Sequence, residues 1–143
     1  MIRKYEEKDI DELLDVWYSA SQVAHSFLDK DFFEQERKTF THPNLQRTET
    51  LVYEKDNKVV GFITLMDELV YAFFVDIDFQ HSGIGRALMD YAKSIRPFLE
   101  LYVFKDNEIG RKFYKKYGFI ELSKHRDKET GFTQLKLKLK LTY

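Results

Sequence analysis

The uninterrupted apolar run Leu69–Val75 constrains the fold more than any other part of this 143-residue chain. A strand with one solvent-exposed face alternates polar and apolar residues, whereas a strand buried on both faces is apolar throughout. Such a strand needs a helical layer on each side of its sheet. The run therefore predicts a central strand at residues 69–75, in a sheet that is covered on both faces.

The hydrophobic period of the other residues predicts the elements around this strand. Asp9 is placed to cap a helix in which Ile10, Leu13, Leu14 and Trp17 follow the i, i+3, i+4, i+7 pattern. The full predicted order is a strand at 2–5, this helix, a helix at 31–40, a loop at 41–49, a hairpin of 50–54 and 59–66, the strand 69–75, a helix at 83–95, a strand at 98–104, a short helix capped by Asp106 or Asn107, and strands at 119–123 and 132–141.

Two of these helices carry a set of apolar residues. Residue Gly118 stands where the C-terminal cap of the short helix belongs. The short helix carries Ile109, Phe113 and Tyr117, and the helix at 83–95 has Ile84, Leu88, Tyr91, Ala92 and Ile95 on one face.

The order β-α-α-β-β-β-α-β-α-β-β combines antiparallel hairpins with two strand–helix–strand units. It predicts an α/β (α+β) fold with a mixed, mostly antiparallel central sheet and helices on both faces. The chain contains no repeat, no low-complexity segment and no linker-like stretch. We therefore expect residues 1–143 to form a single domain.

The charge balance and the lack of cysteine exclude several classes of protein. With 23 Lys and Arg against 24 Asp and Glu, the net charge of −1 gives no strong attraction to nucleic acid or anionic membranes. No apolar run approaches the ~20 residues of a membrane span, and no signal-peptide core is visible at the N-terminus. Without Cys there is no disulfide, thiolate nucleophile or Cys-based metal site. We expect a cytoplasmic protein without nucleic-acid or membrane partners.

A glycine-containing loop follows the buried strand and opens a helix. The N–H groups at a helix N-terminus bind phosphate, and Gly83 and Gly85 let an anion approach the backbone. A dinucleotide fingerprint is excluded because Leu88 replaces its third glycine, and a Walker A loop because Arg86 follows Gly85. From this loop alone, a phosphate site and a turn without a ligand are equally compatible.

A second segment follows the next strand and favours the phosphate site over a turn without a ligand. It contains Asn107, the pair Phe113-Tyr114 and the pair Gly118-Phe119. Together with Gln80-x-x-Gly83-x-Gly85, it resembles the GCN5-related N-acetyltransferase family. That family has a Gln/Arg-x-x-Gly-x-Gly/Ala loop after its fourth strand and an Asn…Phe-Tyr-x-x-x-Gly-Phe segment after its fifth. The resemblance covers nearly the whole chain, and the segment from Trp17 to Leu28 resembles a group of small bacterial acetyltransferases.

The resemblance implies roles for these residues. The fourth and fifth strands splay apart in this family, and the backbone of Phe74, Val75 and Asp76 would pair with the pantetheine arm of acetyl-CoA. A strand N–H near Val75 would polarise the thioester carbonyl. Asn107 would hydrogen-bond the pantetheine, and Tyr114 would protonate the leaving thiolate as general acid. Backbone N–H groups would hold the pyrophosphate at Gln80, His81, Ser82, Gly83, Ile84, Gly85 and Arg86.

Three positions depart from the family pattern. Ile77 stands where the family often has Pro, Gly110 where it often has Ala, and Ser82 where it usually has Gly or a basic residue. None of the three substitutions removes a backbone donor from the loop, so the implied site stands.

The acceptor side is less determined. Glu68 and His25 are candidate general bases, with a turn residue and a structural histidine as the alternatives, and ordered water can replace a single base. Tyr71 and Tyr102 line the cleft or fill the core. The aromatic residues that either wall the acceptor pocket or pack beneath it are Phe27, Phe32, Phe33 and Phe40.

The predicted function is transfer of an acetyl group from acetyl-CoA to a primary amine, on a protein lysine, a protein N-terminus or a small molecule. Because no Cys is present to form an acetyl-enzyme, we expect direct attack in a ternary complex, by a monomer or a homodimer. The alternatives are a catalytically silent acyl-CoA-binding regulatory module and an interaction domain without a cofactor. No metal is expected, because no two of the histidines stand at i, i+4: His25, His42, His81 and His125.

Overall fold

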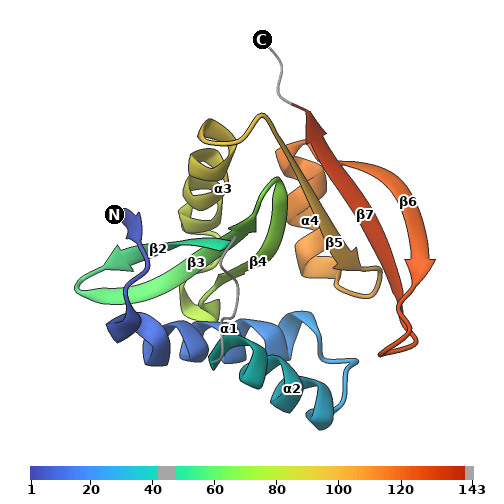
Figure 1. Ribbon diagram of the computed structural model, residues 1–143, viewed down its shortest axis with the longest axis horizontal. Coiled ribbons are helices and arrows are strands. Elements are labelled where there is room, and N and C mark those ends of the chain that lie inside the picture. The colour runs from blue at the N-terminus through green and yellow to red at the C-terminus, as the bar shows by residue number, and fades with distance from the viewer. Residues whose placement is uncertain (42–47, 141–143) are drawn as a thin grey trace.

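The structure is a computed structural model that describes residues 1–41 and 48–140 (Figure 1). The predicted order of helices and strands is confirmed, with two short 3₁₀ turns added. The predicted loop at 41–49 falls mostly on residues 42–47, outside the described residues. In chain order the elements are β1 (Ile2–Lys4), η1 (Glu7–Asp9), α1 (Ile10–Ala24), α2 (Lys30–Thr41), β2 (Thr48–Lys55), β3 (Lys58–Met66), β4 (Leu69–Val75), η2 (Ile77–Phe79), α3 (Ile84–Ser94), β5 (Phe98–Phe104), α4 (Glu108–Tyr117), β6 (Ile120–Arg126) and β7 (Thr133–Lys140).

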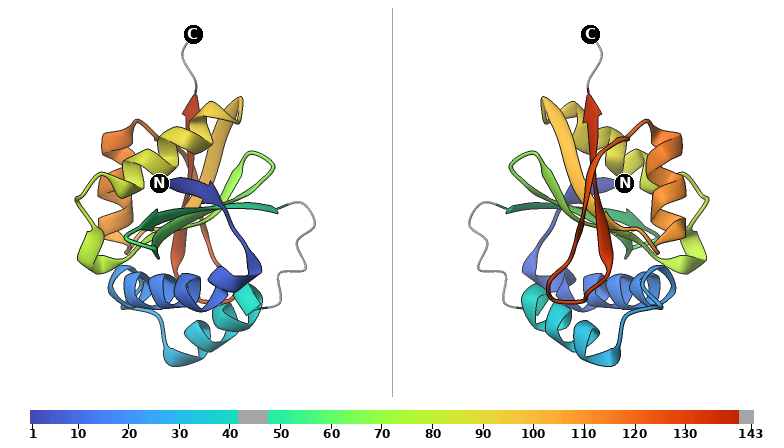
Figure 2. Two further views of the ribbon diagram at one scale, coloured as in Figure 1. Left: turned by 90° about the vertical axis from the view of Figure 1, so that its left-hand side faces the viewer. Right: turned by 90° about the vertical axis from the view of Figure 1, so that its right-hand side faces the viewer.

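The strands form one sheet in the order β1-β2-β3-β4-β5-β7-β6. All neighbouring strands are antiparallel except β4 and β5, which are parallel. Helices α1 and α2 lie on one side of the sheet, and α3 and α4 lie on the other (Figure 2). A mixed, mostly antiparallel sheet between helices is the architecture that the sequence predicts.

Each helical layer encloses its own hydrophobic core. The cluster on the α1 side is built around Trp17 and Phe62, both fully buried, and the larger cluster on the other side includes Leu88 and Leu101. In β7, Leu135, Leu137 and Leu139 are buried while the intervening lysines point outward, as expected of a half-buried strand. No helix within the described ranges is long and apolar enough to cross a membrane.

The prediction that β4 is buried on both faces is wrong, although its bounds are as predicted. Tyr71 is 39% exposed. The pairing of β3 with β4 shifts at this point, because Thr64 pairs with Ala72 and Leu65 pairs with Val70, which leaves Tyr71 out of the register. A β-bulge of this kind turns a side chain away from the regular alternation.

The apolar residues predicted for α3 and α4 are only partly buried. Tyr91 and Ile95 are exposed, because the buried stripe of α3 turns toward Met89 and the helix ends at Ser94, before Ile95. Ile109 is exposed too, on the outer face of the first turn of α4. The inner face of α4 instead carries Phe113, Tyr114 and Tyr117, with Tyr114 its buried residue.

The contact between β4 and β5 is confined to one end of the two strands. Leu69 pairs with Glu100, and the N–H of Glu100 donates to the carbonyl of Glu68 at 2.9 Å. Beyond this point the described ladder has no further pairs between them, and the strands diverge toward their C-terminal ends (Figure 1). We call the space between these ends, at Val75 and Phe104, the β4–β5 gap.

Candidate active site

The loop at residues 80–86 folds back on the end of β4. The amide of Gln80 donates to the carbonyl of Val75 at 3.1 Å, and His81 has a positive φ of 64°. The first hydrogen bond of α3 runs from the N–H of Ala87 to the carbonyl of Gly83, at 3.0 Å. The N–H groups of residues 84–86 precede it, so they have no partner within the helix and suit an anion.

The two glycines of this loop are required for different reasons. Gly83 caps α3 with a φ of 87°, and a Cβ built there would meet no atom within 4 Å, so its backbone conformation is what favours glycine. At Gly85, a Cβ would lie 3.3 Å from the ring of Phe73 and 3.4 Å from that of Phe113. Close packing of α3 against β4 and α4 therefore explains Gly85.

Asn107 begins α4 at the end of β5. Its side-chain oxygen Oδ1 accepts from the N–H of Gly110 at 2.9 Å, and its own N–H donates to the carbonyl of Phe104 at 3.0 Å. A Cβ at Gly110 would lie 2.6 Å from Asn107 Nδ2. The buried Asn107 side chain therefore occupies the space that an alanine at position 110 would need, which explains that departure from the family pattern.

Tyr114 lies on the inner face of α4, two turns after Asn107. Its ring is near those of Phe73, at 6.2 Å, and Phe119, at 5.5 Å, and the residue is only 9% exposed. Burial raises the pKa of Tyr114 above its ordinary value of 10, so the hydroxyl is protonated at neutral pH. None of the described hydrogen bonds involves this hydroxyl, and no fully buried side-chain N or O atom of the described residues lacks a partner. The hydroxyl therefore reaches solvent.

His25 follows α1 and packs against side chains at the ends of the two diverging strands. Its ring centroid is 6.3 Å from that of Phe74 in β4 and 5.3 Å from that of Phe104 in β5. Its Nδ1 is 3.1 Å from Ser21 Oγ, and its Nε2 is 3.4 Å from Asn107 Nδ2. Burial lowers the pKa of His25 to about 4, so the ring is neutral at pH 7. Two candidates from distant parts of the sequence, His25 and Asn107, thus meet at the gap.

The phenylalanines of the α1–α2 region lie in two places, beside the β4–β5 gap and in the hydrophobic core of the α1 layer. Phe27 contacts Phe104 at 5.5 Å and Phe132 at 4.9 Å, and Phe32 lies 6.2 Å from Phe104, so both lie beside the gap at the end of β5. Phe33 packs on Trp17 at 6.3 Å and belongs to the core of the α1 layer. The side chain of Phe40 and the whole of His42 lie outside the described residues.

The other candidates for the acceptor side are separated by the fold. Glu68 lies in the β3–β4 turn, seven residues and roughly 20 Å of strand before Val75. The structure therefore does not bring it to the loop, Asn107 or Tyr114. Tyr71 and Tyr102 do not fill the core, because they are 39% and 47% exposed on the two strands that flank the gap.

The sequence pattern does not single out one half-buried carboxylate of α2. Glu36 of α2 is half-buried, and burial together with the charge of Glu129 raises its pKa. It also interacts with Tyr71, whose pKa is raised by burial and by Glu36. A single Glu in an amphipathic helix rich in charged residues does not stand out, and only the fold sets it opposite the bulged Tyr71.

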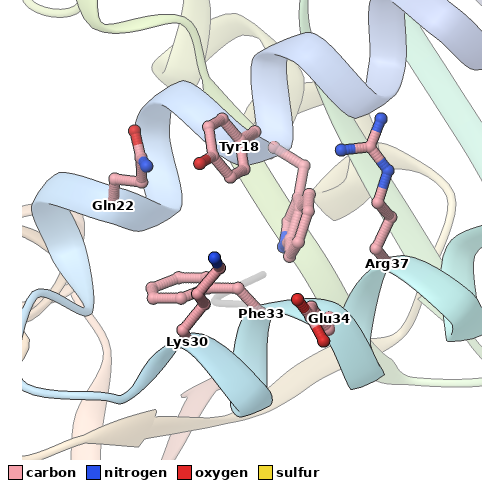
Figure 3. A pocket seen from close by; sticks show the side chains of 7 residues that line it. Tyr18, Gln22, Lys30, Phe33, Glu34 and Arg37 are labelled. Carbon is pink, nitrogen blue, oxygen red and sulfur yellow. The ribbon is translucent and has the colours of Figure 1, made fainter.

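A separate pocket of about 450 Å³ lies between α1 and α2 (Figure 3). Of the candidates above, it shares only Phe33. Three of its lining residues come from α1 and four from α2: Trp17, Tyr18, Gln22, Lys30, Phe33, Glu34 and Arg37. In the part of the chain that the structure describes, no group of three or more His, Asp or Glu side chains is arranged to hold a metal ion.

Comparison with known proteins identifies the family. The model of the acetyltransferase (GNAT) domain matches residues 28–121. The peptidyl-lysine N-acetyltransferase YiaC of Escherichia coli is 28% identical over 120 residues, 83% of this chain and 82% of YiaC. The peptidyl-lysine N-acetyltransferase YjaB of the same organism is 32% identical over 120 residues, 82% of this chain and 80% of YjaB.

Solved structures agree with this assignment. The solution structure of the apo form of E. coli YjaB has a TM-score of 0.85 at 26% identity, covering 96% of this chain and 95% of that one. The ribosomal-protein-S18-alanine N-acetyltransferase of E. coli has the same fold, with a TM-score of 0.74 at 22% identity, covering 100% of this chain and 96% of that one. The chain therefore belongs to the GNAT family and is an N-acetyltransferase.

Proposed function

We propose that this enzyme transfers the acetyl group of acetyl-CoA directly to a primary amine, with lysine side chains of proteins as the preferred acceptor. The observation that carries the proposal is the β4–β5 gap. The single register pair at Leu69 and Glu100 leaves the end of β4 without a neighbour on that side. An open strand edge of this kind binds an extended chain through backbone hydrogen bonds, as in β-strand addition.

The backbone of β4 supports this fit. The N–H of Asp76 donates to the carbonyl of Val60 in β3 at 2.9 Å. Because N–H groups alternate in direction along a strand, the N–H of Val75 faces the gap instead. Phe74, Val75 and Asp76 would therefore accompany the pantetheine arm, and the Val75 N–H is available to polarise a carbonyl there.

The loop and Asn107 would hold the rest of acetyl-CoA. The free N–H groups at the start of α3, together with the loop from Gln80 through His81 and Ser82 to Arg86, suit the pyrophosphate. Asn107 stands at the opposite wall, and its Oδ1, already bonded to Gly110, retains a second lone pair for the pantetheine. Acetyl-CoA supplies the acetyl group as a reactive thioester.

Tyr114 would act as the general acid. When the amine attacks, a C–N bond forms, the C–S bond breaks, and the departing sulfur needs a proton. The Tyr114 hydroxyl is protonated at neutral pH, has no hydrogen bond to any described residue and reaches solvent, so it is free to supply that proton. The amine releases its own proton to ordered water, because Glu68 lies at the far end of β4.

The acceptor class rests on the relatives and on one carboxylate. The similar E. coli proteins are named peptidyl-lysine N-acetyltransferases. In this chain, the half-buried Glu36 beside Tyr71 would attract the cationic ammonium of a lysine to the acceptor side. A lysine-containing protein surface therefore fits this side of the gap.

The decisive experiment combines a titration with a rate measurement. We expect acetyl-CoA to bind in calorimetry with micromolar affinity, about −8 kcal/mol, and the enzyme to release CoA when a lysine peptide is added. Binding without transfer to any amine of a broad panel would support the silent regulatory module instead. No heat with either acetyl-CoA or CoA at several temperatures would refute both.

A further inference from the structure

The hydrogen bonds around His25 fix its protonation. Because Asn107 Oδ1 accepts from the Gly110 N–H, the Asn107 amide must turn its Nδ2 donor toward His25. The facing Nε2 of His25 therefore carries a lone pair and accepts, weakly at 3.4 Å. The ring proton then sits on Nδ1 and is donated to Ser21 Oγ at 3.1 Å. A second ring proton, on Nε2, would place the N–H donors of His25 Nε2 and Asn107 Nδ2 opposite each other.

The rest of the His25 environment is apolar. The ring is approached edge-on by phenylalanines from the α1–α2 connection, α2, β4 and β5, with interplanar angles from 77° to 90°. These are Phe27, Phe32, Phe74 and Phe104, and the polar neighbours are Ser21 of α1 and Asn107. Among the contacts that the structure describes, no element turns a charged group toward the ring. A general base must accept and carry a proton, and this site offers a cation no stabilisation.

The same ring touches both walls of the gap. Phe74 lies near the end of β4 and Phe104 ends β5, so the imidazole packs against side chains that both strands turn toward the α1 layer. Through Asn107 it also reaches the first turn of α4, the helix that carries Tyr114 two turns later.

We propose that His25 is a positioning residue and not the general base: its neutral ring packs against the Phe74 and Phe104 side chains at the ends of β4 and β5 and fixes the Asn107 side chain. This inference rests on the proposed function, because the gap and Asn107 are where the pantetheine would bind. It assigns His25 to the preparation of the acetyl-CoA slot and leaves proton removal from the amine to water.

Steady-state kinetics of two His25 variants test the proposal. His25→Phe keeps a ring between Phe74 and Phe104 and removes both nitrogens, whereas His25→Gln keeps an amide that can still bond Asn107. We expect His25→Phe to raise KM for acetyl-CoA about tenfold with kcat within about threefold, and His25→Gln to restore most of the KM. The matched control is His125→Phe in the exposed strand β6, which leaves both constants unchanged.

If His25 were the general base, its substitution would change kcat and leave KM unchanged. Its loss lowers kcat by about 10²–10⁴ with KM unchanged, and removes the acidic limb of the pH–rate profile. Either that result, or unchanged constants in His25→Phe, would overturn the positioning role.

Nitrogen NMR of the wild-type ring needs no variant and no activity. We expect the neutral Nδ1–H form of His25 at pH 7 and at pH 5.5. An imidazolium or an Nε2–H tautomer of His25 at pH 7 would refute the inference. If the wild type binds CoA but acetylates nothing, the proposed reaction fails, and the affinity of His25→Phe for CoA together with these spectra still decides the role of His25.

Discussion

The substitution Tyr114→Phe separates the chemistry of Tyr114 from its packing. The ring is buried among Phe73, Phe113 and Phe119, and phenylalanine keeps all of these ring contacts. What disappears is a hydroxyl that has no hydrogen bond to any described protein group. Removing such a group costs no protein–protein hydrogen bond, so we expect a free energy of unfolding within about 0.5 kcal/mol of wild type.

The rate should respond very differently. If the hydroxyl protonates the departing thiolate, its loss lowers kcat by about 10²–10⁴, which corresponds to roughly 3–5 kcal/mol of barrier. The affinity for CoA should change by less than about threefold, because the loop at 80–86 and the β4 edge are untouched. Stopped-flow release of CoA, calorimetry and chemical denaturation give the three quantities on one preparation.

Tyr117→Phe on the same helix is the matched control. The Tyr117 hydroxyl donates to Asp90 Oδ1 at 2.5 Å, and this side chain is half-buried. Its loss should destabilise the fold by about 1 kcal/mol, discounted for solvent screening, and leave kcat unchanged. A Tyr114→Phe enzyme with wild-type kcat would refute the assignment of Tyr114 as the acid. A stability loss as large as that of Tyr117→Phe would refute the inference that the Tyr114 hydroxyl has no hydrogen bond within the protein.

Three further predictions concern the loop, the N-terminal ion pair and the acceptor. Gly83→Ala forces an alanine to φ 87°, and should cost about 1–2 kcal/mol of stability and weaken acetyl-CoA binding in calorimetry, whereas Gly131→Ala, at φ 79° in the β6–β7 turn, should cost stability alone. The hydrogen bonds from Arg3, at 2.8 and 2.9 Å, lower the pKa of Asp9 below its ordinary value, so their stabilisation is present above about pH 4 and is lost as the pH falls through the folded-state pKa. Denaturation of Asp9→Asn should show about 1–2 kcal/mol less stability at pH 7 and a flatter pH dependence below pH 4, and an unchanged slope would contradict this. Because water and not His25 takes the proton, the acidic limb of kcat/KM should follow the acceptor, moving down by about two pH units from a lysine amine to an α-amine, and a limb that stays in place would point to an enzyme group.

Local signals explain how much of the fold the sequence predicted. The apolar runs that end at Val75 and Phe104 gave the bounds of β4 and β5 to the residue, because both are flanked by polar or turn-forming residues. Gly118 was expected at the end of α4, and it stands there at φ 122°. Periodicity does not determine which residues of an apolar face are buried, because that depends on what the helix packs against, so Tyr91 and Ile95 share the apolar face of α3 and are exposed.

The parts that the sequence did not predict depend on contacts between distant residues. The bulge that turns Tyr71 outward arises from the pairing of β3 with β4, and no pattern within β4 alone encodes it. Residues His25 and Asn107 were separate candidates with separate roles. Their contact links positions 82 residues apart, and only the packing of α1 against the start of α4 brings it about.

Tyr114 and His25 illustrate how the same apolar surroundings prepare two groups on either side of one gap. Burial disfavours the charged form of both, so it keeps the tyrosine protonated and the imidazole unprotonated at pH 7. The protonated Tyr114 hydroxyl has no hydrogen-bond partner among the described residues and can donate to a ligand. Both ring nitrogens of His25, in contrast, already form hydrogen bonds. The first arrangement suits a group that gives up a proton during the reaction, and the second suits one that holds its neighbours in place. In this fold, burial alone therefore does not identify a catalytic residue. A polar side-chain atom that has no hydrogen-bond partner among the described residues does.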